Sequence, residues 1–315
     1  MKINKEMLLE ILRMSKKDLR RKIKSHKDCI PGKFSFLWFK GTGLPCLVAH
    51  IDTVYDDEPN WENRDILYNE RYIWSPQGIG GDDRCGVYAL MELYNELDVN
   101  CLFTDLEETG GKGAKEACKI FEEQLENTPY FIEIDRRGFK EFVCYNNDEE
   151  NIEFIEKVEM FFEWNVGSFS DISTLGEHFN VCSANLSAGF YNEHRKESEY
   201  VYLPALKYTM KTIPKLIKEL GSKRYELPET YSFGRYEYEE DFCDCWECPF
   251  FTPYYCYARE DIPCFGAKGC VYEKKDLTND LTNLTGKIES DFKPKSLPFV
   301  GKLVKKKKLK KRGRG

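Results

Sequence analysis

Short apolar runs and amphipathic segments alternate along roughly the first 220 residues of the chain. The short runs have the length and the aromatic and β-branched content of strands, whereas apolar positions at helical spacing predict helices. Alternating strands and helices predict an α/β domain. The predicted strands cover residues 34–39, 45–54, 71–74, 99–103, 130–135, 141–145 and 181–191. The predicted helices cover residues 6–23, 87–93, 114–121, 151–162 and 203–220, and Gly221 fits a C-cap.

Length and composition favour one large domain with a small appendage. The chain has 315 residues, of which 41% are hydrophobic and 14% aromatic, enough for a packed core. No apolar run approaches the ~18 residues that a membrane span needs, and the N-terminus lacks the apolar stretch of a signal peptide. The odd total of thirteen cysteines favours reduced thiols. We therefore expect a cytoplasmic protein without a membrane partner.

Composition divides the chain into three parts. Residues 1–222 form the predicted core, and residues 223–275 are acidic, aromatic and cysteine-rich. Residues 276–315 are a linker and a basic tail, which we expect to be disordered. The net charge is −7, and without the basic tail the body is more acidic still. Because an acidic body repels nucleic acid, we expect a nucleic-acid contact only through the tail.

Three short acidic segments lie within the predicted core, each downstream of an apolar run. They are residues 49–54, 80–86 and 103–110. Together they contain one histidine and several aspartates and glutamates. In open α/β sheets, sites form at strand ends. We therefore expect the three segments to meet in one site.

The residue types in these segments suit metal-dependent hydrolysis. A site with two metals needs a bridging carboxylate, further imidazole and carboxylate ligands, and a base for the attacking water. His50 would be a ligand, and Asp52, on the same strand face, could accept its other ring N–H or merely cap a turn. Asp82 or Asp83 would bridge the metals, with neighbouring glycines allowing close approach, although Asp83 could also form an ordinary turn.

Glu107 and Glu108 are adjacent acids that point in different directions from the chain. One of them can bind metal while the other faces the water. A raised pKa at the second position would suit a general base. The two glutamates thus supply the remaining parts of a hydrolytic site.

These segments resemble the signature of the dinuclear zinc exopeptidases, the superfamily of peptidase T, carboxypeptidase G and the leucyl and glutamyl zinc aminopeptidases. The matching motifs are His50-Ile51-Asp52-Thr53-Val54, Gly81-Asp82-Asp83-Arg84-Cys85-Gly86 and Glu107-Glu108-Thr109-Gly110-Gly111-Lys112-Gly113-Ala114. The resemblance spans residues 45–206, about half the chain. It implies a three-layer α/β/α fold with a mostly parallel, mixed central sheet, of the phosphorylase/hydrolase-like type.

The resemblance also implies a role for each matching position. Asp82 looks like the bridging ligand, and the family's cis peptide bond would here join Asp82 to Asp83. Glu107 resembles the general base, and Asp52 joins it among the catalytic residues. The implied cofactors are two Zn²⁺ ions, with Co²⁺ or Mn²⁺ as substitutes. The implied metal ligands are His50 and Asp135 on one ion, Glu108 and His194 on the other, and Asp82 on both.

Three residues offer alternatives to this assignment. His178 could replace His194 as a ligand, or it could be a surface residue. Glu133 shares a strand face with Asp135 and could be the ligand instead, although it lies deeper in the strand. Asp171 could approach the site or act as a helix N-cap.

The spacing of the motifs predicts a core without an inserted lid. Some relatives insert a domain between the third carboxylate ligand and the last histidine, or between the first histidine and the bridging aspartate. The intervals from Asp135 to His194 and from His50 to Asp82 are too short for either insertion. In plan the chain is closest to the leucyl-type zinc aminopeptidases.

The appendage concentrates cysteines in a segment too small to build its own core. A Cys-x-x-Cys pair with later cysteines is compatible with a structural zinc site. Disulfides, unpaired thiols or an iron–sulfur cluster are the alternatives. The candidate ligands are Cys243, Cys245, Cys248, Cys256, Cys264 and Cys270.

The sequence therefore predicts a metallopeptidase, in particular an aminopeptidase, whose partner is a peptide substrate. A deacylase or amidase acting on an N-acyl amino acid is the alternative enzyme. A catalytically inactive binding protein on the same scaffold is the alternative outside enzymes. The presence of every expected ligand argues against this last hypothesis.

Overall fold

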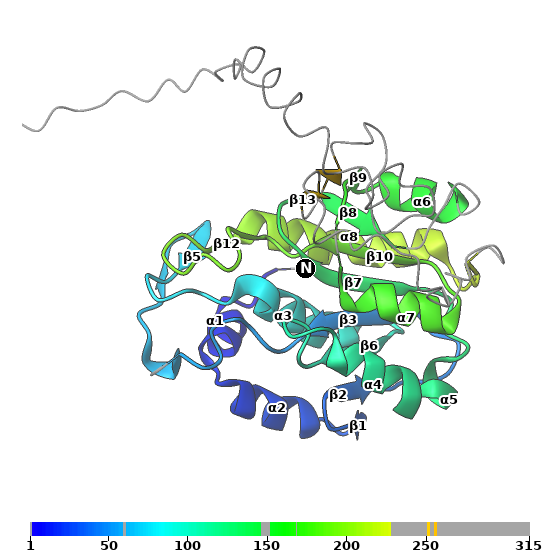
Figure 1. Ribbon diagram of the computed structural model, residues 1–315, viewed down its shortest axis with the longest axis horizontal. Coiled ribbons are helices and arrows are strands. Elements are labelled where there is room, and N and C mark those ends of the chain that lie inside the picture. Colours follow the sequence, from blue (N-terminus) through cyan, green and yellow to red (C-terminus); the bar gives the residue numbers. More distant parts are fainter. Residues whose placement is uncertain are drawn as a thin grey trace, which may run out of the picture. The chain divides into compact units, whose positions relative to one another are not determined.

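A mixed sheet forms the centre of the computed structural model (Figure 1). The structure describes residues 2–58, 61–145, 152–167 and 169–227, and the strand backbone at 251–252 and 255–256. Within these ranges the sheet has eight strands in the order β1-β2-β6-β3-β7-β10-β8-β9. They are β1 (Cys29–Pro31), β2 (Ser35–Trp38), β3 (Cys46–His50), β6 (Asn100–Thr104), β7 (Phe131–Arg136), β8 (Glu141–Cys144), β9 (Glu163–Trp164) and β10 (Ser183–Ser187).

The middle of this sheet is parallel and buried. Strand β3 pairs in parallel with β6 on one side and with β7 on the other, and β7 pairs in parallel with β10. Every residue of β3, β6 and β10 is buried. Such continuous burial is typical of parallel strands that helices cover on both faces.

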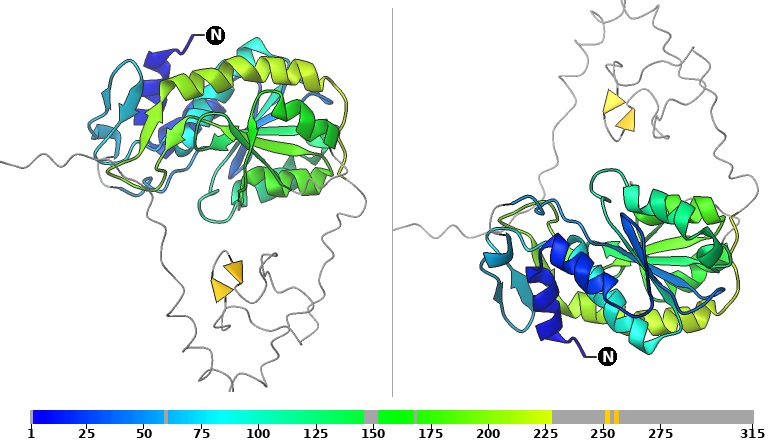
Figure 2. Two further views of the ribbon diagram at one scale, coloured as in Figure 1. Left: turned by 90° about the horizontal axis from the view of Figure 1, so that it is seen from above. Right: turned by 90° about the horizontal axis from the view of Figure 1, so that it is seen from below.

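Helices cover both faces of the sheet (Figure 2). The two faces of β3 belong to different hydrophobic clusters, since Leu47 packs with α1, α3 and α8 while Val48 packs with α4 and α7. This alternation confirms the predicted three-layer α/β/α fold. The helices are α1 (Lys5–Arg13), α2 (Lys16–Lys24), α3 (Gly81–Glu96), α4 (Lys112–Ile120), α5 (Glu122–Leu125), α6 (Ile152–Glu159), α7 (Asp171–Phe179), α8 (Leu203–Leu220) and the 3₁₀ helix η1 (Trp61–Asn63).

A second, antiparallel sheet lies beside the start of α3, which it contacts through β11 and β12. Its strand order is β11-β12-β5-β4. These strands are β4 (Leu67–Tyr68), β5 (Tyr72–Trp74), β11 (Phe190–Tyr191) and β12 (Tyr200–Tyr202). In the described part of the chain between Asp135 and His194, all elements belong to these two sheets and their helices, so no lid is inserted there.

Two sequence predictions of single elements are wrong. The segment 6–23 forms two helices, because Met14 is extended and the Ser15 side chain caps α2 by accepting the N–H of Asp18. The segment 181–191 divides into β10 and β11, which belong to different sheets. Gly189 lies between them with φ of 87°, and a Cβ atom there would meet the backbone nitrogen of Leu206 at 2.6 Å. By contrast, α8 spans 203–220 as predicted, with Gly221 as its C-cap.

Residues 223–227, which composition placed in the appendage, pack against the core. Arg224 donates hydrogen bonds to the carbonyl oxygens of Glu126, Thr128 and Phe179. Tyr225 is 4% exposed and accepts a hydrogen bond from the backbone of Cys182 at 2.7 Å. The core therefore continues beyond residue 222.

Most of the appendage lies outside the described residues. Beyond residue 227, the described parts are β13 (Phe251–Thr252) and β14 (Tyr255–Cys256), which form an antiparallel pair of their own. The tail at 276–315 and the proposed cysteine ligands Cys243, Cys245, Cys248, Cys264 and Cys270 also lie outside, and for Cys256 only the backbone is described. The structural zinc thus stays a prediction. Among the described residues, no helix has the length and apolar character that a membrane crossing requires.

The packing of Tyr225 predicts a large loss of stability for Tyr225→Ala in the full-length chain. Its ring contacts Tyr130 and Phe154, and its hydroxyl donates to the carbonyl oxygen of Leu220. Truncating a buried aromatic residue typically costs about 3–5 kcal/mol, and we expect a decrease of that size in the free energy of unfolding. Urea unfolding measures it, with Tyr68→Ala, at a half-exposed tyrosine, as control. If both substitutions lower the free energy of unfolding by the same small amount, the packing of Tyr225 against the core is contradicted.

Candidate metal centre

The predicted site residues meet where three parallel strands end. His50 is the last residue of β3, Asp135 lies at the end of β7, and the turn that carries Glu107 and Glu108 follows β6. Because β6, β3 and β7 are neighbours in the sheet, their carboxyl ends share one edge. Asp82 approaches this edge from the first turn of α3.

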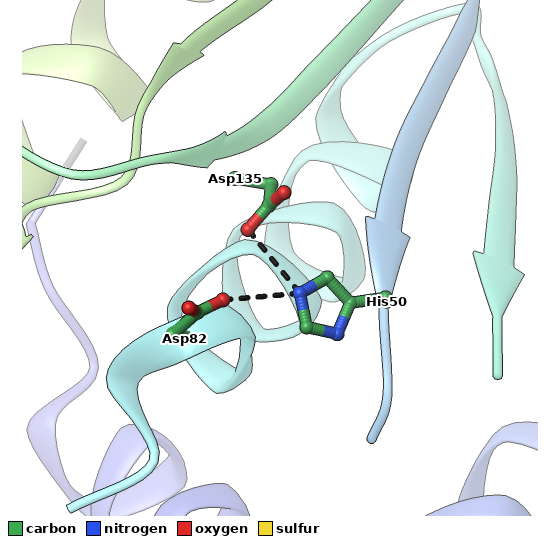
Figure 3. A group of neighbouring side chains, drawn as sticks. All are labelled: His50, Asp82 and Asp135. Carbon is green, nitrogen blue, oxygen red and sulfur yellow. Dashed lines mark hydrogen bonds and ion pairs between the residues drawn. The ribbon is translucent and has the colours of Figure 1, made fainter. Parts of the chain in front are cut away.

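His50, Asp82 and Asp135 form one of two clusters that could hold a metal ion, called here the first ligand group. Both carboxylates point toward the same ring nitrogen of His50 (Figure 3). His50 Nε2 lies 3.0 Å from Asp82 Oδ1 and 3.3 Å from Asp135 Oδ1. The imidazole is 1% exposed, so its orientation is set by the surrounding protein.

Asp52 contacts the other side of His50 and organises the neighbouring turn. His50 Nδ1 lies 3.0 Å from the carbonyl oxygen of Asp52 and 3.5 Å from its carboxylate, so the backbone is the closer acceptor. The carboxylate instead accepts the backbone N–H groups of Glu107 at 3.2 Å and Glu108 at 3.3 Å. Asp52 thereby orients His50 and holds the turn that presents both glutamates.

Asp82, Glu108 and His194 form the second ligand group. His194 Nε2 lies 3.1 Å from Glu108 Oε1 and 3.2 Å from Asp82 Oδ2. His194 follows β11 in a left-handed conformation, with φ of 61° and a side chain that is 50% exposed. Asp82 therefore contributes one carboxylate oxygen to each group.

Asp83 has a different orientation from Asp82. The peptide bond between them is cis. Asp83 is fully buried and accepts the backbone N–H of Gly86 at 2.9 Å, within the first turn of α3. A Cβ atom at position 86 would lie 2.1 Å from the carbonyl oxygen of Ile134, which explains the glycine of this motif. Of the two aspartates that could bridge the metals, Asp82 is the one that faces both histidines.

The three alternative residues lie outside both ligand groups. Glu133 is fully buried and accepts a hydrogen bond from the hydroxyl of Ser170. His178 is exposed on α7, where its ring contacts Phe179. Asp171 is buried as the first residue of α7, whose N-cap is Ser170. Of the two alternatives for Asp171, the N-cap role is therefore wrong, whereas the approach to the site holds, because Asp171 acts on the pKa of Glu107.

Burial and neighbouring charges shift the pKa values of residues in the site. Burial raises the pKa of Glu107 to about 7; His50 opposes this shift, whereas Asp171 and Glu108 add to it. Hydrogen bonds with Asp82 and Glu108 raise the pKa of His194 to about 10. Burial disfavours the charged form of His50, yet the carboxylate of Asp135 raises its pKa well above the ordinary value. The cluster thus holds protons on its histidines at neutral pH.

The donor set fits two divalent metal ions. In each group, three ligand atoms lie within 4.8 Å of one another. Imidazole nitrogens and carboxylate oxygens are zinc ligands, and three protein ligands leave room for water or substrate, as in catalytic sites. A cavity of about 380 Å³ opens onto both groups, and Arg136, Tyr145 and Phe169 also line it. No local pattern in the sequence marks these wall residues as part of a site.

Solved peptidase structures share this fold. An aminopeptidase PepT from Bacillus cereus has a TM-score of 0.53 and 12% sequence identity, over 68% of this chain and 97% of that chain. A tripeptidase from Staphylococcus aureus has a TM-score of 0.50 and 15% identity, over 69% of this chain and 99% of that chain. No family model and no curated protein matches the chain. The structural similarity confirms the α/β fold that the motifs predicted.

The raised pKa of His194 predicts that metal affinity increases with pH. In the metal-free protein this imidazole is protonated below a pH of about 10, and it must lose the proton before it can bind a metal. We expect affinity to rise by up to about tenfold per pH unit for each proton released. Calorimetric titration with Zn²⁺ in buffers of different ionisation enthalpy counts the released protons.

The control for this titration is His178→Ala, which removes an exposed histidine outside both ligand groups. This variant should show the same pH dependence and release the same number of protons as the unmodified chain. Affinity that does not vary with pH, with no proton release, would contradict the protonation of the ligand histidines.

Proposed function

We propose that the chain is a metal-dependent hydrolase of peptide bonds, acting as an aminopeptidase with two zinc ions. One observation carries the proposal: Asp82 directs its two carboxylate oxygens to different histidines, in two three-residue ligand groups. A shared carboxylate is what a pair of metal ions requires. A cluster of acids that binds no metal would not need one carboxylate placed between two imidazoles.

His50, Asp82 and Asp135 would hold one ion, and Asp82, Glu108 and His194 the other. When bound, such ions polarise the scissile carbonyl and make a nucleophile of water at neutral pH. Co²⁺ and Mn²⁺ are expected to substitute for Zn²⁺, since imidazole and carboxylate ligands also suit them.

Glu107 is the proposed general base. It lines the cavity beside both ligand groups, and its pKa of about 7 lies near the pH at which a base works best. The Asp52 carboxylate accepts the backbone N–H of Glu107 and so restrains the turn from which its side chain projects. Glu107 would accept a proton from the attacking water and deliver it to the leaving amine.

A substrate screen tests the activity directly. The cavity suits one or a few residues rather than a folded protein, and both structures with the same fold are described as peptidases. We expect aminoacyl and short peptide substrates to be cleaved in the presence of Zn²⁺, Co²⁺ or Mn²⁺. N-acyl amino acids form the comparison set. If only the N-acyl compounds are cleaved, the protein is a deacylase and not a peptidase. If neither set is cleaved, the proposal of a hydrolase is contradicted.

Separate substitutions of the adjacent glutamates test their roles. Glu107→Gln should keep the metals and the fold but lower kcat by roughly 10²–10⁴-fold, the usual loss for a general base. Glu108→Gln should instead weaken binding of the second metal, because Glu108 contacts His194 and Glu107 does not. Metal content and kcat are measured for both variants, which serve as each other's control. Exchanged phenotypes would show that the two roles are reversed.

A further inference from the structure

Glu199 is a buried carboxylate that joins two segments of the candidate site. It is 1% exposed and lies immediately before β12. Its Oε2 atom accepts the backbone N–H groups of Ile79 at 3.2 Å and Gly80 at 3.1 Å, and its Oε1 atom accepts that of Gly81 at 2.7 Å. Three N–H donors on one carboxylate make a strong, charge-assisted contact.

The donors belong to the turn that leads directly into Asp82. Helix α3 has Gly80 as its N-cap residue, which has no side chain to accept a hydrogen bond, and the backbone departs from helical geometry at Asp82 and Asp83. The buried N–H groups of the turn before Asp82 therefore need an acceptor from elsewhere. Glu199 supplies the missing acceptor from a distant part of the chain, and it fixes the backbone from which Asp82 projects.

Glu199 also ends the loop that carries His194. The backbone N–H of Arg195 donates to the carbonyl oxygen of Asn192, and that of Glu199 donates to the carbonyl oxygen of Arg195. The side chain of Asn192 closes the loop by donating to the carbonyl oxygen of Ser198 at 3.0 Å. The loop is thus internally bonded, and the Glu199 carboxylate is its anchor on the Asp82 turn.

Close packing restricts the turn on its other side. A Cβ atom at Gly81 would lie 2.8 Å from Phe190 Cβ and 3.0 Å from Val201 Cγ2. Phe190 and Val201 are register partners in β11 and β12, the strands on either side of the His194 loop. The second sheet and Glu199 therefore hold the same turn together, and only glycine allows the backbone to approach this closely.

We propose that Glu199 is a positioning residue that holds His194 against Asp82 and thereby sets the affinity of the second metal group. This inference rests on the metal sites of the proposed function. The first group draws two of its ligands from buried strands of the central sheet, whereas the second depends on a loop residue that is half exposed. Weakening the anchor should therefore affect the two groups unequally.

Glu199→Gln in the full-length chain provides the test. The amide nitrogen of glutamine cannot accept a hydrogen bond, so at least one backbone N–H loses its acceptor at nearly unchanged side-chain size. We expect affinity for the second metal to fall about 10–100-fold, as is usual when a residue that orients a ligand is replaced. The first metal should lose less affinity than the second, because its other two ligands, His50 and Asp135, lie on strands of the central sheet. Titration with Co²⁺, followed by its visible absorption bands, reports each ligand environment separately.

Glu197→Gln is the matched control, since it makes the same change at an exposed residue of the same loop. It should leave both affinities unchanged. If Glu199→Gln does not fold, Glu199→Asp is used, which keeps the charge but shortens the reach of the carboxylate. In that variant too, a larger loss of affinity for the second metal than for the first supports the inference.

Equal weakening of both metals by the Glu199 variants, or no weakening, would overturn the positioning role. Failure of the proposed function has a different signature. In that case the unmodified chain would bind fewer than two metal ions in the described core or would cleave no substrate, whatever residue stands at position 199.

Discussion

The division of one carboxylate between two histidines is the interaction on which the site depends. Asp82 reaches His50 with one oxygen and His194 with the other, so three segments distant in sequence must converge to within hydrogen-bonding distance. The fold achieves this by ending β3 at the sheet edge and beginning α3 beside it. Glycines at positions 81 and 86 allow the backbone of α3 to approach both the second sheet and β7.

This convergence places many carboxylates in a small, partly buried volume. Burial and the neighbouring acids raise the pKa of Asp135 and of Glu133 well above their ordinary values. These shifts favour the protonated forms of both acids, and the carboxylates of the site in turn favour the protonated forms of His50 and His194. Divalent cations would replace those protons, because a buried charge persists only when it is paired. Metal binding, proton release and the stability of this region are therefore linked properties.

Local patterns were sufficient for most of the fold, since apolar periodicity located α8 and the central strands. The ligand set came instead from the family resemblance, and the residues it named, His50, Asp82, Glu108, Asp135 and His194, lie together in two groups that could hold a metal ion. Periodicity failed at residues 6–23, where Ser15 starts a new helix within a continuous amphipathic pattern.

Relations between distant residues could not be read from the chain. Glu133 and Asp135 lie on the same strand face, so the alternation of side chains along a strand could not show which of them belongs to the site. Only the structure distinguishes them, because it buries Glu133 deeper, beside Ser170. Likewise, no local signal connects Glu199 with the turn before Asp82, because the contact exists only after the second sheet has formed.

The most direct test of the shared carboxylate compares the metal content of the full-length chain with that of Asp82→Ala and His194→Ala. Comparing variants in this way cancels any metal that the appendage binds. If Asp82 serves both groups, Asp82→Ala should lose about two divalent ions, and His194→Ala should lose about one. An Asp82→Ala chain that folds and loses one ion or none would contradict the account.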